Sequence, residues 1–269
     1  MNNTIGILGC GWLGLPLATT LVENKYTVKG STTTLEKMVL LKKAGITPFL
    51  INLSENGITG DINGFLEHLD VLLINIPPRV RSEPKENYFK KITHLYQVVK
   101  NSKVRTVLFI SSTSVYGENQ GQVTEDTLPK PTSEAGKQLL ATEDIFRKDK
   151  NLNTTIIRFG GLIGPNRNPA NFLAGKKDLT NGDDPVNLIH LEDCIGLIRT
   201  VIENNYTNLL INGVYPLHPT KEDYYTSEAR KMNIVPPTYQ PRKNVKGYKI
   251  IENSPYIVKI YQYHTSIIS

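Results

Sequence analysis

The chain has 269 residues, a hydrophobic content of 39% and a formal net charge of +6 at pH 7. This composition is typical of a globular protein that is large enough to bury a sizeable core. The sequence shows no signal-like segment and no apolar run near the length of a membrane span, so we expect a cytoplasmic protein without a membrane partner.

The positive charge raises the question of nucleic-acid binding. Lysines and arginines are scattered in ones and twos, and no basic run alternates with aromatic residues as a stacking surface would. We therefore expect no nucleic-acid partner, and the charge fits a solvated surface or a site for a small anion. Cys10 and Cys194 are too few for a disulfide framework or a metal cage, so no metal site is predicted.

The segment Gly9-Cys10-Gly11-Trp12-Leu13-Gly14 follows the apolar run at residues 4–8 and precedes a second apolar segment. A strand, a tight glycine turn and a helix N-terminus in this order place backbone N–H groups and a helix dipole against a pyrophosphate. Gly9 allows the turn, Gly11 lets the backbone approach the phosphate, and Gly14 lets the helix pack on the strand. The segment predicts a dinucleotide-binding loop. Its cofactor-binding residues are predicted to be Gly9, Gly11, Trp12, Leu13 and Gly14.

The end of the second predicted strand, at residues 26–30, is where ribose specificity is set. An NAD enzyme usually places an acidic residue there to bind the ribose 2′-hydroxyl, and residues 26–34 contain none. Hydroxyl and ammonium groups nearby favour NADP over NAD, because they could hold its 2′-phosphate; alternatively, the hydroxyls only cap the helix predicted at residues 35–44. These groups belong to Ser31, Thr32, Thr33, Lys29 and Lys37.

Apolar strands alternate with helical patterns along the chain, which predicts an α/β fold with a Rossmann-like, doubly wound parallel sheet. The further strands are predicted at residues 47–53, 71–74, 106–111, 154–158 and 209–213, with strand character again at 257–263. Ligands lie at strand ends in such a sheet. The cofactor-binding residues predicted at these ends are Ile76, Pro77, Ser111 and Phe159. Arg79 and Arg81 either meet an anionic substrate or are solvated loop charges.

Several motifs resemble one known family. They are the glycine loop, residues 111–117 (SSTSVYG), Arg158 with Gly164-Pro165, and residues 187–193 (NLIHLED). Together they resemble the extended short-chain dehydrogenase/reductase superfamily, which includes nucleotide-sugar epimerases and dehydratases. The resemblance implies an NAD(P)-binding domain at residues 1–159 and a smaller substrate-side region at 160–269, of which 186–213 return to the Rossmann part. It also implies a small-molecule substrate, such as a nucleotide sugar or carbonyl compound, and a homodimer.

In this superfamily a Ser or Thr, a Tyr and a Lys carry the chemistry. The resemblance places Ser112 at the serine position. Residues 131–143 match the pattern around the Tyr and the Lys but put Ala135 and Leu139 at those two positions. A methyl group cannot donate a proton and an isobutyl group cannot shift a pKa, so the chain resembles the atypical members of the superfamily.

Two functions remain open. In the first, the protein is an enzyme in which Ser112 bonds the substrate oxygen and another residue replaces the missing acid. The candidates are Tyr88, Tyr116, Glu134 and His190, of which Tyr116 and His190 fit a structural role better. In the second, the protein binds or senses NADP(H) without catalysis.

Overall fold

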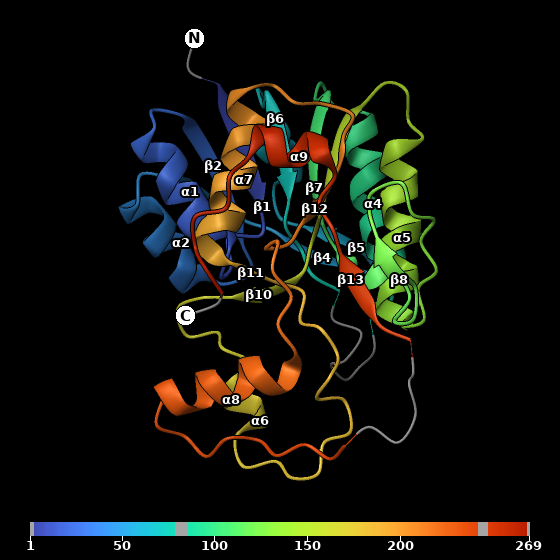
Figure 1. Ribbon diagram of the computed structural model, residues 1–269. Coiled ribbons are helices and arrows are strands. Elements are labelled where there is room, and N and C mark those ends of the chain that lie inside the picture. Colours follow the sequence, from blue (N-terminus) through green and yellow to red (C-terminus); the bar gives the residue numbers. More distant parts are fainter. Residues whose placement is uncertain (1–2, 79–85, 242–246, 268–269) are drawn as a thin grey trace.

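A seven-stranded parallel sheet with the order β12-β9-β7-β6-β1-β2-β3 is the centre of the computed structural model, which describes residues 3–78, 86–241 and 247–267 (Figure 1). Its strands are β1 (Thr4–Leu8), β2 (Thr27–Thr32), β3 (Thr47–Leu50), β6 (Val71–Ile74), β7 (Thr106–Ser112), β9 (Asn153–Phe159) and β12 (Leu210–Gly213). The order reverses at β1, as in a doubly wound sheet. The predicted fold class is confirmed. Arg79 and Arg81 lie outside the described residues.

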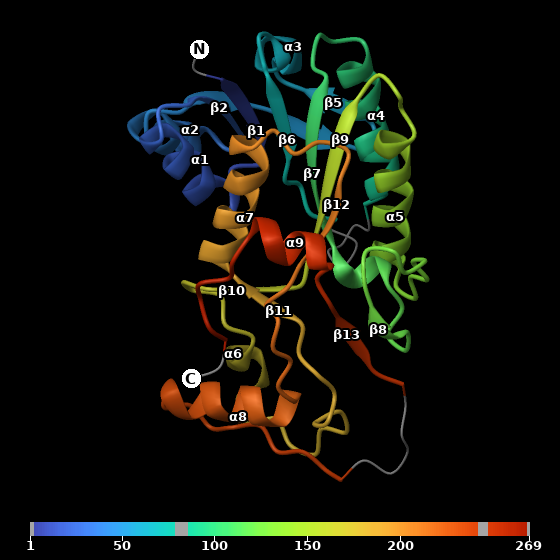
Figure 2. The same cartoon turned by 45° about the horizontal axis from the view of Figure 1, so that its top comes forward.

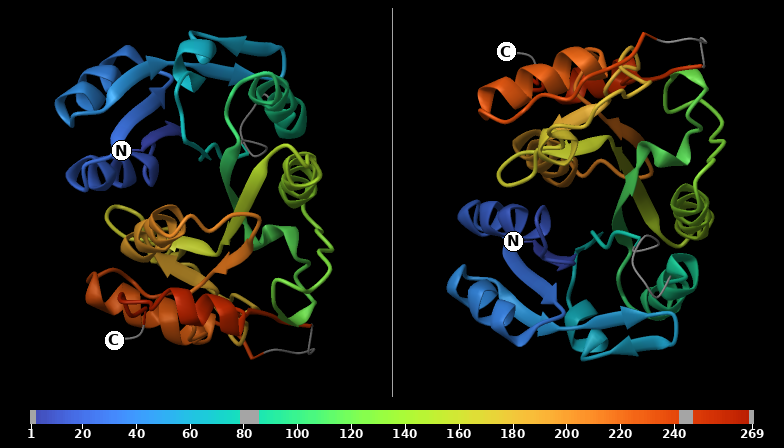
Figure 3. Two further views of the ribbon diagram at one scale, coloured as in Figure 1. Left: turned by 90° about the horizontal axis from the view of Figure 1, so that it is seen from above. Right: turned by 90° about the horizontal axis from the view of Figure 1, so that it is seen from below.

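Helices cover both faces of the sheet, and Figure 3 shows the two layers from above and below. On one face lie α1 (Gly14–Glu23), α2 (Leu35–Lys43) and α7 (Leu191–Glu203), and on the other lie α4 (Tyr88–Lys100) and α5 (Glu134–Arg147). The central strands are therefore buried on both sides, and all four residues of β6 are buried. This explains why their sequences are continuous apolar runs rather than alternating ones.

Two large hydrophobic clusters correspond to these layers. One contains Leu17 and Leu21 of α1 with Leu197 and Ile198 of α7. The other joins residues from α4 and α5 to the opposite side of the strands. Side-chain caps begin several helices; for example, the Ser133 hydroxyl accepts a hydrogen bond from the Gly136 backbone N–H at the start of α5 (3.1 Å).

A smaller lobe lies beyond the carboxyl ends of the sheet strands, as Figure 2 shows. Its elements are β10 (Gly161–Ile163), α6 (Ala170–Leu173), β11 (Leu188–His190) and α8 (Lys221–Lys231). Beside it, β13 (Lys249–Ile251) pairs with β8 (Gly121–Val123). The remaining short elements are the hairpin β4 (Asn52–Ser54) and β5 (Gly57–Thr59), the helix α3 (Ile62–Leu66) and the 3₁₀ turn η1 (Thr113–Val115).

Two predicted strands differ from the structure. The strand predicted at residues 47–53 divides into β3 and β4. The strand predicted at 257–263 is wrong, because helix α9 (Pro255–Ile260) occupies most of it. Pro255 suits the first position of a helix, and Ile257 and Tyr261, four residues apart, are both buried in the cluster that contains α7. The packing of these two side chains at helical spacing therefore stabilises a helix here, although the β-branched residues of the segment favour a strand.

Candidate functional site

The turn between β1 and α1 needs glycine at two positions for its own geometry. Gly9 has φ +107°, and a Cβ there would lie 2.5 Å from the Asn75 carbonyl oxygen. A Cβ on Gly14 would lie 2.2 Å from the Gly9 carbonyl oxygen. Gly11 differs, because a Cβ there would meet nothing within 4 Å. Gly11 therefore borders open space, as expected where a backbone approaches a phosphate.

Hydrogen bonds from two neighbouring strands hold this turn in place. The Gly9 backbone N–H donates to the Ser31 hydroxyl (2.9 Å), and the Cys10 N–H donates to the Ser31 carbonyl oxygen (2.9 Å). The Asn75 side-chain amide donates to the Gly9 carbonyl oxygen (3.0 Å). Ser31 therefore has a structural task that its sequence position did not reveal, although its hydroxyl proton is still available to a ligand.

A cleft of about 320 Å³ opens beside the turn. Its volume lies in the range of small-molecule sites. The predicted cofactor residues that line it are Gly9, Gly11, Ser31, Thr32, Thr33, Ile76 and Pro77. Lys37 of α2 also lines it, whereas the Lys29 ammonium donates to the carbonyl oxygens of Gly64 (2.8 Å) and Glu67 (2.7 Å). Lys29 is therefore committed to the α3 region rather than to the cleft.

Other predicted cofactor residues lie near the turn without lining this cleft. Trp12 points toward the smaller lobe, because its indole N–H donates to the Pro165 carbonyl oxygen (2.9 Å) and the Arg167 guanidinium lies 4.9 Å from its ring centroid. Leu13 and Gly14 are buried at the start of α1. Contact of these three residues with a dinucleotide remains a prediction.

Ser111 and Phe159 lie at the carboxyl ends of β7 and β9, and both are buried. The Ser111 hydroxyl donates to Glu143 (2.6 Å). The Phe159 ring packs so closely on Gly213 that a Cβ there would lie 2.4 Å from it. Their predicted cofactor contacts likewise remain predictions.

An ion pair in the cleft was missed by sequence reasoning. Lys91 is only 5% exposed, and its ammonium lies 2.9 Å from a carboxylate oxygen of Glu86. Both residues line the cleft. The sequence does contain a sign of this pair. Lys91 lies between Tyr88 and Ile92 on the apolar face of α4, and a lysine is buried on such a face only when it has a partner.

Ser112, the predicted catalytic serine, ends β7 and is half-buried. Its hydroxyl oxygen accepts a hydrogen bond from the Ser114 backbone N–H (3.1 Å), which starts the 3₁₀ turn η1. A serine hydroxyl that accepts one bond still has its own proton to donate. Ser112 lines neither the cleft beside the glycine turn nor the larger one beside the smaller lobe, so its contact with a ligand oxygen remains a prediction.

Tyr116 belongs to a buried polar network behind this strand end. Its hydroxyl accepts a hydrogen bond from Arg158 (2.8 Å) and lies 3.1 Å from the Asn212 side-chain oxygen. Arg158 in turn is paired with Glu143. Burial raises the pKa of Tyr116, and the charge of Arg158 only partly opposes this. Tyr116 is 1% exposed, so its position is that of a structural residue.

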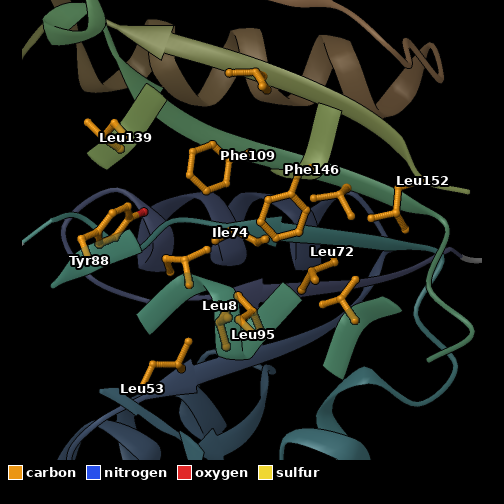
Figure 4. Close-up of a cluster of buried hydrophobic side chains, with 14 of the residues drawn as sticks. Leu8, Leu53, Leu72, Ile74, Tyr88, Leu95, Phe109, Leu139, Phe146 and Leu152 are labelled. Atoms are coloured by element: carbon orange, nitrogen blue, oxygen red, sulfur yellow. The ribbon is translucent and has the colours of Figure 1, made fainter. Parts of the chain in front are cut away.

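Ala135 and Leu139 both lie on α5. Ala135 is half-buried near the helix start, and Leu139 is buried in the cluster that also contains Tyr88 (Figure 4). The Tyr88 hydroxyl donates to the Ile76 carbonyl oxygen (2.8 Å), and burial raises the pKa of Tyr88 strongly. Tyr88 therefore supports the strand end beside the cleft and is not placed as a proton donor to a ligand.

The two remaining candidates for the acid also have local partners. The exposed Glu134 carboxylate accepts a hydrogen bond from the Gln138 side chain (2.9 Å) one turn along α5. His190 caps α7, because its Nδ1 accepts a hydrogen bond from the Glu192 backbone N–H (3.3 Å). His190 therefore fits the structural role that the sequence favoured.

A second, larger cleft of about 830 Å³ lies between the sheet edge and the smaller lobe. Thr113 lines it from the sheet side, Gly161, Asn187 and Lys221 line it from the lobe side, and Lys249 lines it from β13. It is therefore placed to receive a ligand near the ends of β7 and β9, where an open α/β sheet binds ligands.

The reversed strand order and the glycine turn define a protein of the Rossmann-like class. The sequence profile of the NAD dependent epimerase/dehydratase family matches residues 81–208. Protein YeeZ of Escherichia coli (strain K12) is 32% identical over 252 residues, which are 93% of this chain and 91% of YeeZ. The chain belongs to this epimerase/dehydratase family, as an atypical short-chain dehydrogenase/reductase of the extended type.

Solved structures agree with this fold. A UDP-glucuronic acid 4-epimerase from Bacillus cereus, in complex with UDP-glucuronic acid and NAD, superposes with a TM-score of 0.78 at 21% identity, over 98% of this chain and 95% of the epimerase. MoeE5, in complex with the same two ligands, has a TM-score of 0.78 at 18% identity, with the same coverage. Within the described ranges, no helix is long and apolar enough to cross a membrane.

Proposed function

We propose that the protein is an NADP(H)-dependent oxidoreductase or epimerase that acts on a small carbonyl or nucleotide-sugar substrate. The observation that carries the proposal is the glycine turn, in which Gly9 and Gly14 are required for packing while Gly11 borders open space. This cradle fits a pyrophosphate on the backbone N–H groups at the start of α1. A bound nicotinamide dinucleotide would supply hydride chemistry to the site.

The cofactor preference rests on the charges around the first cleft. Thr33 and Lys37 are exposed at its edge after β2, where they could hold a 2′-phosphate. Among the described lining residues the only acid is Glu86, which is paired with Lys91. The description of the family and the similar solved structures name NAD, so NAD is the alternative cofactor.

The substrate assignment rests on the second cleft. We assign residues 1–159 to the cofactor domain and 160–269 to the substrate side, with 186–213 contributing α7 and β12 to the Rossmann part. The cleft between them is lined by Lys221, which is paired with Asp184, and by Lys249 and Glu118; the ammonium group of Lys249 has no carboxylate partner among the ion pairs of the described residues and suits an anionic group of a substrate. The B. cereus epimerase and MoeE5 bind UDP-glucuronic acid, a ligand of this kind. We propose that Ser112, which directly precedes the lining residue Thr113, bonds the substrate oxygen; a homodimer in the cytoplasm remains a prediction.

One observation favours a second candidate, a protein that binds or senses NADP(H) without catalysis. Ala135 carries no proton donor, and Leu139 is packed in the hydrophobic cluster with Tyr88. This function predicts dinucleotide binding without turnover of any carbonyl compound.

The test is a panel of carbonyl compounds, whose reduction is measured as oxidation of NADPH, and of nucleotide sugars, whose epimerisation is measured as formation of the epimer. We expect turnover of at least one compound, with a large loss of kcat for Ser112→Ala at unchanged NADPH affinity. Binding of NADPH with no transfer to any compound would favour the sensing protein instead. Failure to bind either NADPH or NADH would overturn both candidates.

A further inference from the structure

Lys249 is held in the second cleft by a polar clamp. The Asn187 side-chain amide donates to the Lys249 carbonyl oxygen (2.9 Å), and its oxygen accepts from the Ile251 backbone N–H (2.8 Å). The backbone carbonyl oxygen of Asn187 also accepts a hydrogen bond from the Gly161 N–H (2.7 Å). One asparagine therefore fixes β13 against the start of β10, so the position of Lys249 in the cleft is determined.

The Lys249 ammonium reaches the turn that follows Ser112. It donates to the carbonyl oxygens of Thr113 (3.2 Å) and Tyr116 (3.3 Å), which lie at the two ends of this turn. An ammonium group has three protons, and these bonds use two of them. The third is available to a ligand in the cleft, which Lys249 and Thr113 both line.

The surroundings of Lys249 favour proton exchange. Its side chain is half-buried, and burial lowers the pKa of Lys249. Of the charged groups that face it, Glu118 after the turn raises this pKa and Lys221 at the start of α8 lowers it. Lys221 is itself held by Asp184 through an ion pair (3.0 Å). Lys249 has no carboxylate partner among the ion pairs of the described residues.

We propose that Lys249 is the proton-transfer residue of this cleft, in the place of the Tyr and Lys that Ala135 and Leu139 do not supply. The inference rests on the proposed function. When negative charge develops on a substrate oxygen in this cleft, an N–H bond of the Lys249 ammonium breaks and an O–H bond to that oxygen forms. The neutral amine then recovers a proton from water, and the reverse reaction uses the neutral amine as the base.

A chemical test examines the amine without any need for turnover. Trace acetylation with acetic anhydride at several pH values, read by peptide mass spectrometry, compares Lys249 with the exposed Lys103 in the same molecule. We expect Lys249 to react several-fold faster than Lys103 at pH 8, because only the neutral amine reacts. A Lys249 that reacts no faster than Lys103 would overturn the proposal, whatever the enzyme activity.

Substitutions then separate proton transfer from a structural role. K249Q is expected to lower kcat by about a hundredfold or more, while the Kd of NADPH stays the same. K249R keeps the charge and the carbonyl contacts but cannot release a proton near neutral pH, so it should be as impaired as K249Q. Rescue by arginine would assign Lys249 a structural role only. K103Q serves as the matched control.

A failure of the proposed function can be distinguished from a failure of the role of Lys249. Wild-type protein that binds no NADPH would overturn the proposed function and the role of Lys249 together. Wild-type protein that turns over a compound of the panel, with K249Q equally active, would overturn the role of Lys249 alone. If NADPH binds and no compound reacts, the acetylation ratio decides the assignment of Lys249.

Discussion

Glu143 of α5 and Arg158 of β9 form a buried ion pair, with 2.5 Å between Oε2 and Nη2 and side-chain exposures of 0% and 1%. Each partner also forms a hydrogen bond with a residue at or just after the carboxyl end of β7. Glu143 accepts a hydrogen bond from Ser111, and Arg158 donates one to Tyr116. The pair therefore connects α5, the helix that carries Ala135 and Leu139, to the residues on either side of Ser112.

Breaking this pair should destabilise the whole domain. Glu143→Gln leaves the Arg158 charge buried without a counter-charge, and we expect a loss of about 3–5 kcal/mol in the free energy of unfolding, measured with urea. Glu203→Gln, in the exposed pair with Arg199, is the control and should cost less than about 1 kcal/mol. Equal, small losses for both variants would contradict the importance of the buried pair.

The glycine turn allows packing and ligand binding to be separated. Gly11→Ala should leave the melting temperature unchanged, because its Cβ meets nothing, but should weaken NADPH binding by about tenfold or more. Gly14→Ala should lower the melting temperature, since its Cβ would lie 2.2 Å from a carbonyl oxygen. Calorimetry and thermal melts measure both effects. Unchanged NADPH affinity in Gly11→Ala would place the cofactor elsewhere.

Lys37 should decide the cofactor preference. Lys37→Glu puts a negative charge where we expect the 2′-phosphate, so its affinity for NADPH should fall by about tenfold or more while its affinity for NADH changes little. Lys42→Glu makes the same charge change on the same helix, away from the lining of the cleft, and is the matched control. Equal effects of the two substitutions would mean that only the overall charge matters.

Leu139 should not accept the lysine of the superfamily pattern. Leu139→Lys places an ammonium group in a hydrophobic cluster, and we expect a loss of more than about 3 kcal/mol in the free energy of unfolding. Leu139→Met, which keeps the side chain apolar, should cost less than about 1.5 kcal/mol. Full stability of the lysine variant would show that this part of α5 is open to the cleft.

The features that could be predicted from the sequence are those that depend on local pattern. The apolar run at Val71–Ile74 predicts a strand that is buried on both faces, and the spacing of the glycines predicts a tight turn between a strand and a helix. Both predictions agree with the structure. The error at Pro255–Ile260 arose because a short apolar segment has no clear period, and packing against α7 decides its form.

The details of the site depend on contacts between distant segments, which no local pattern contains. Ser31 was predicted as a ligand residue; its bond to Gly9, which follows the neighbouring strand β1, could not be predicted from a local pattern. Lys29 was predicted near a phosphate and instead bonds carbonyl oxygens around α3. Lys249 lies in a segment for which the sequence predicts no site residue, and the pairing of β13 with β8 and the bonds from Asn187 bring it to the cleft.

The most direct test of the central claim is a titration of the wild-type protein with NADPH and, separately, with NADH. Trp12, the only tryptophan in the chain, lies in the glycine turn and reports binding by its fluorescence. We predict micromolar binding of NADPH that is clearly tighter than that of NADH. Binding of neither nucleotide would contradict the account, because the turn would then be a structural feature of the fold without a cofactor.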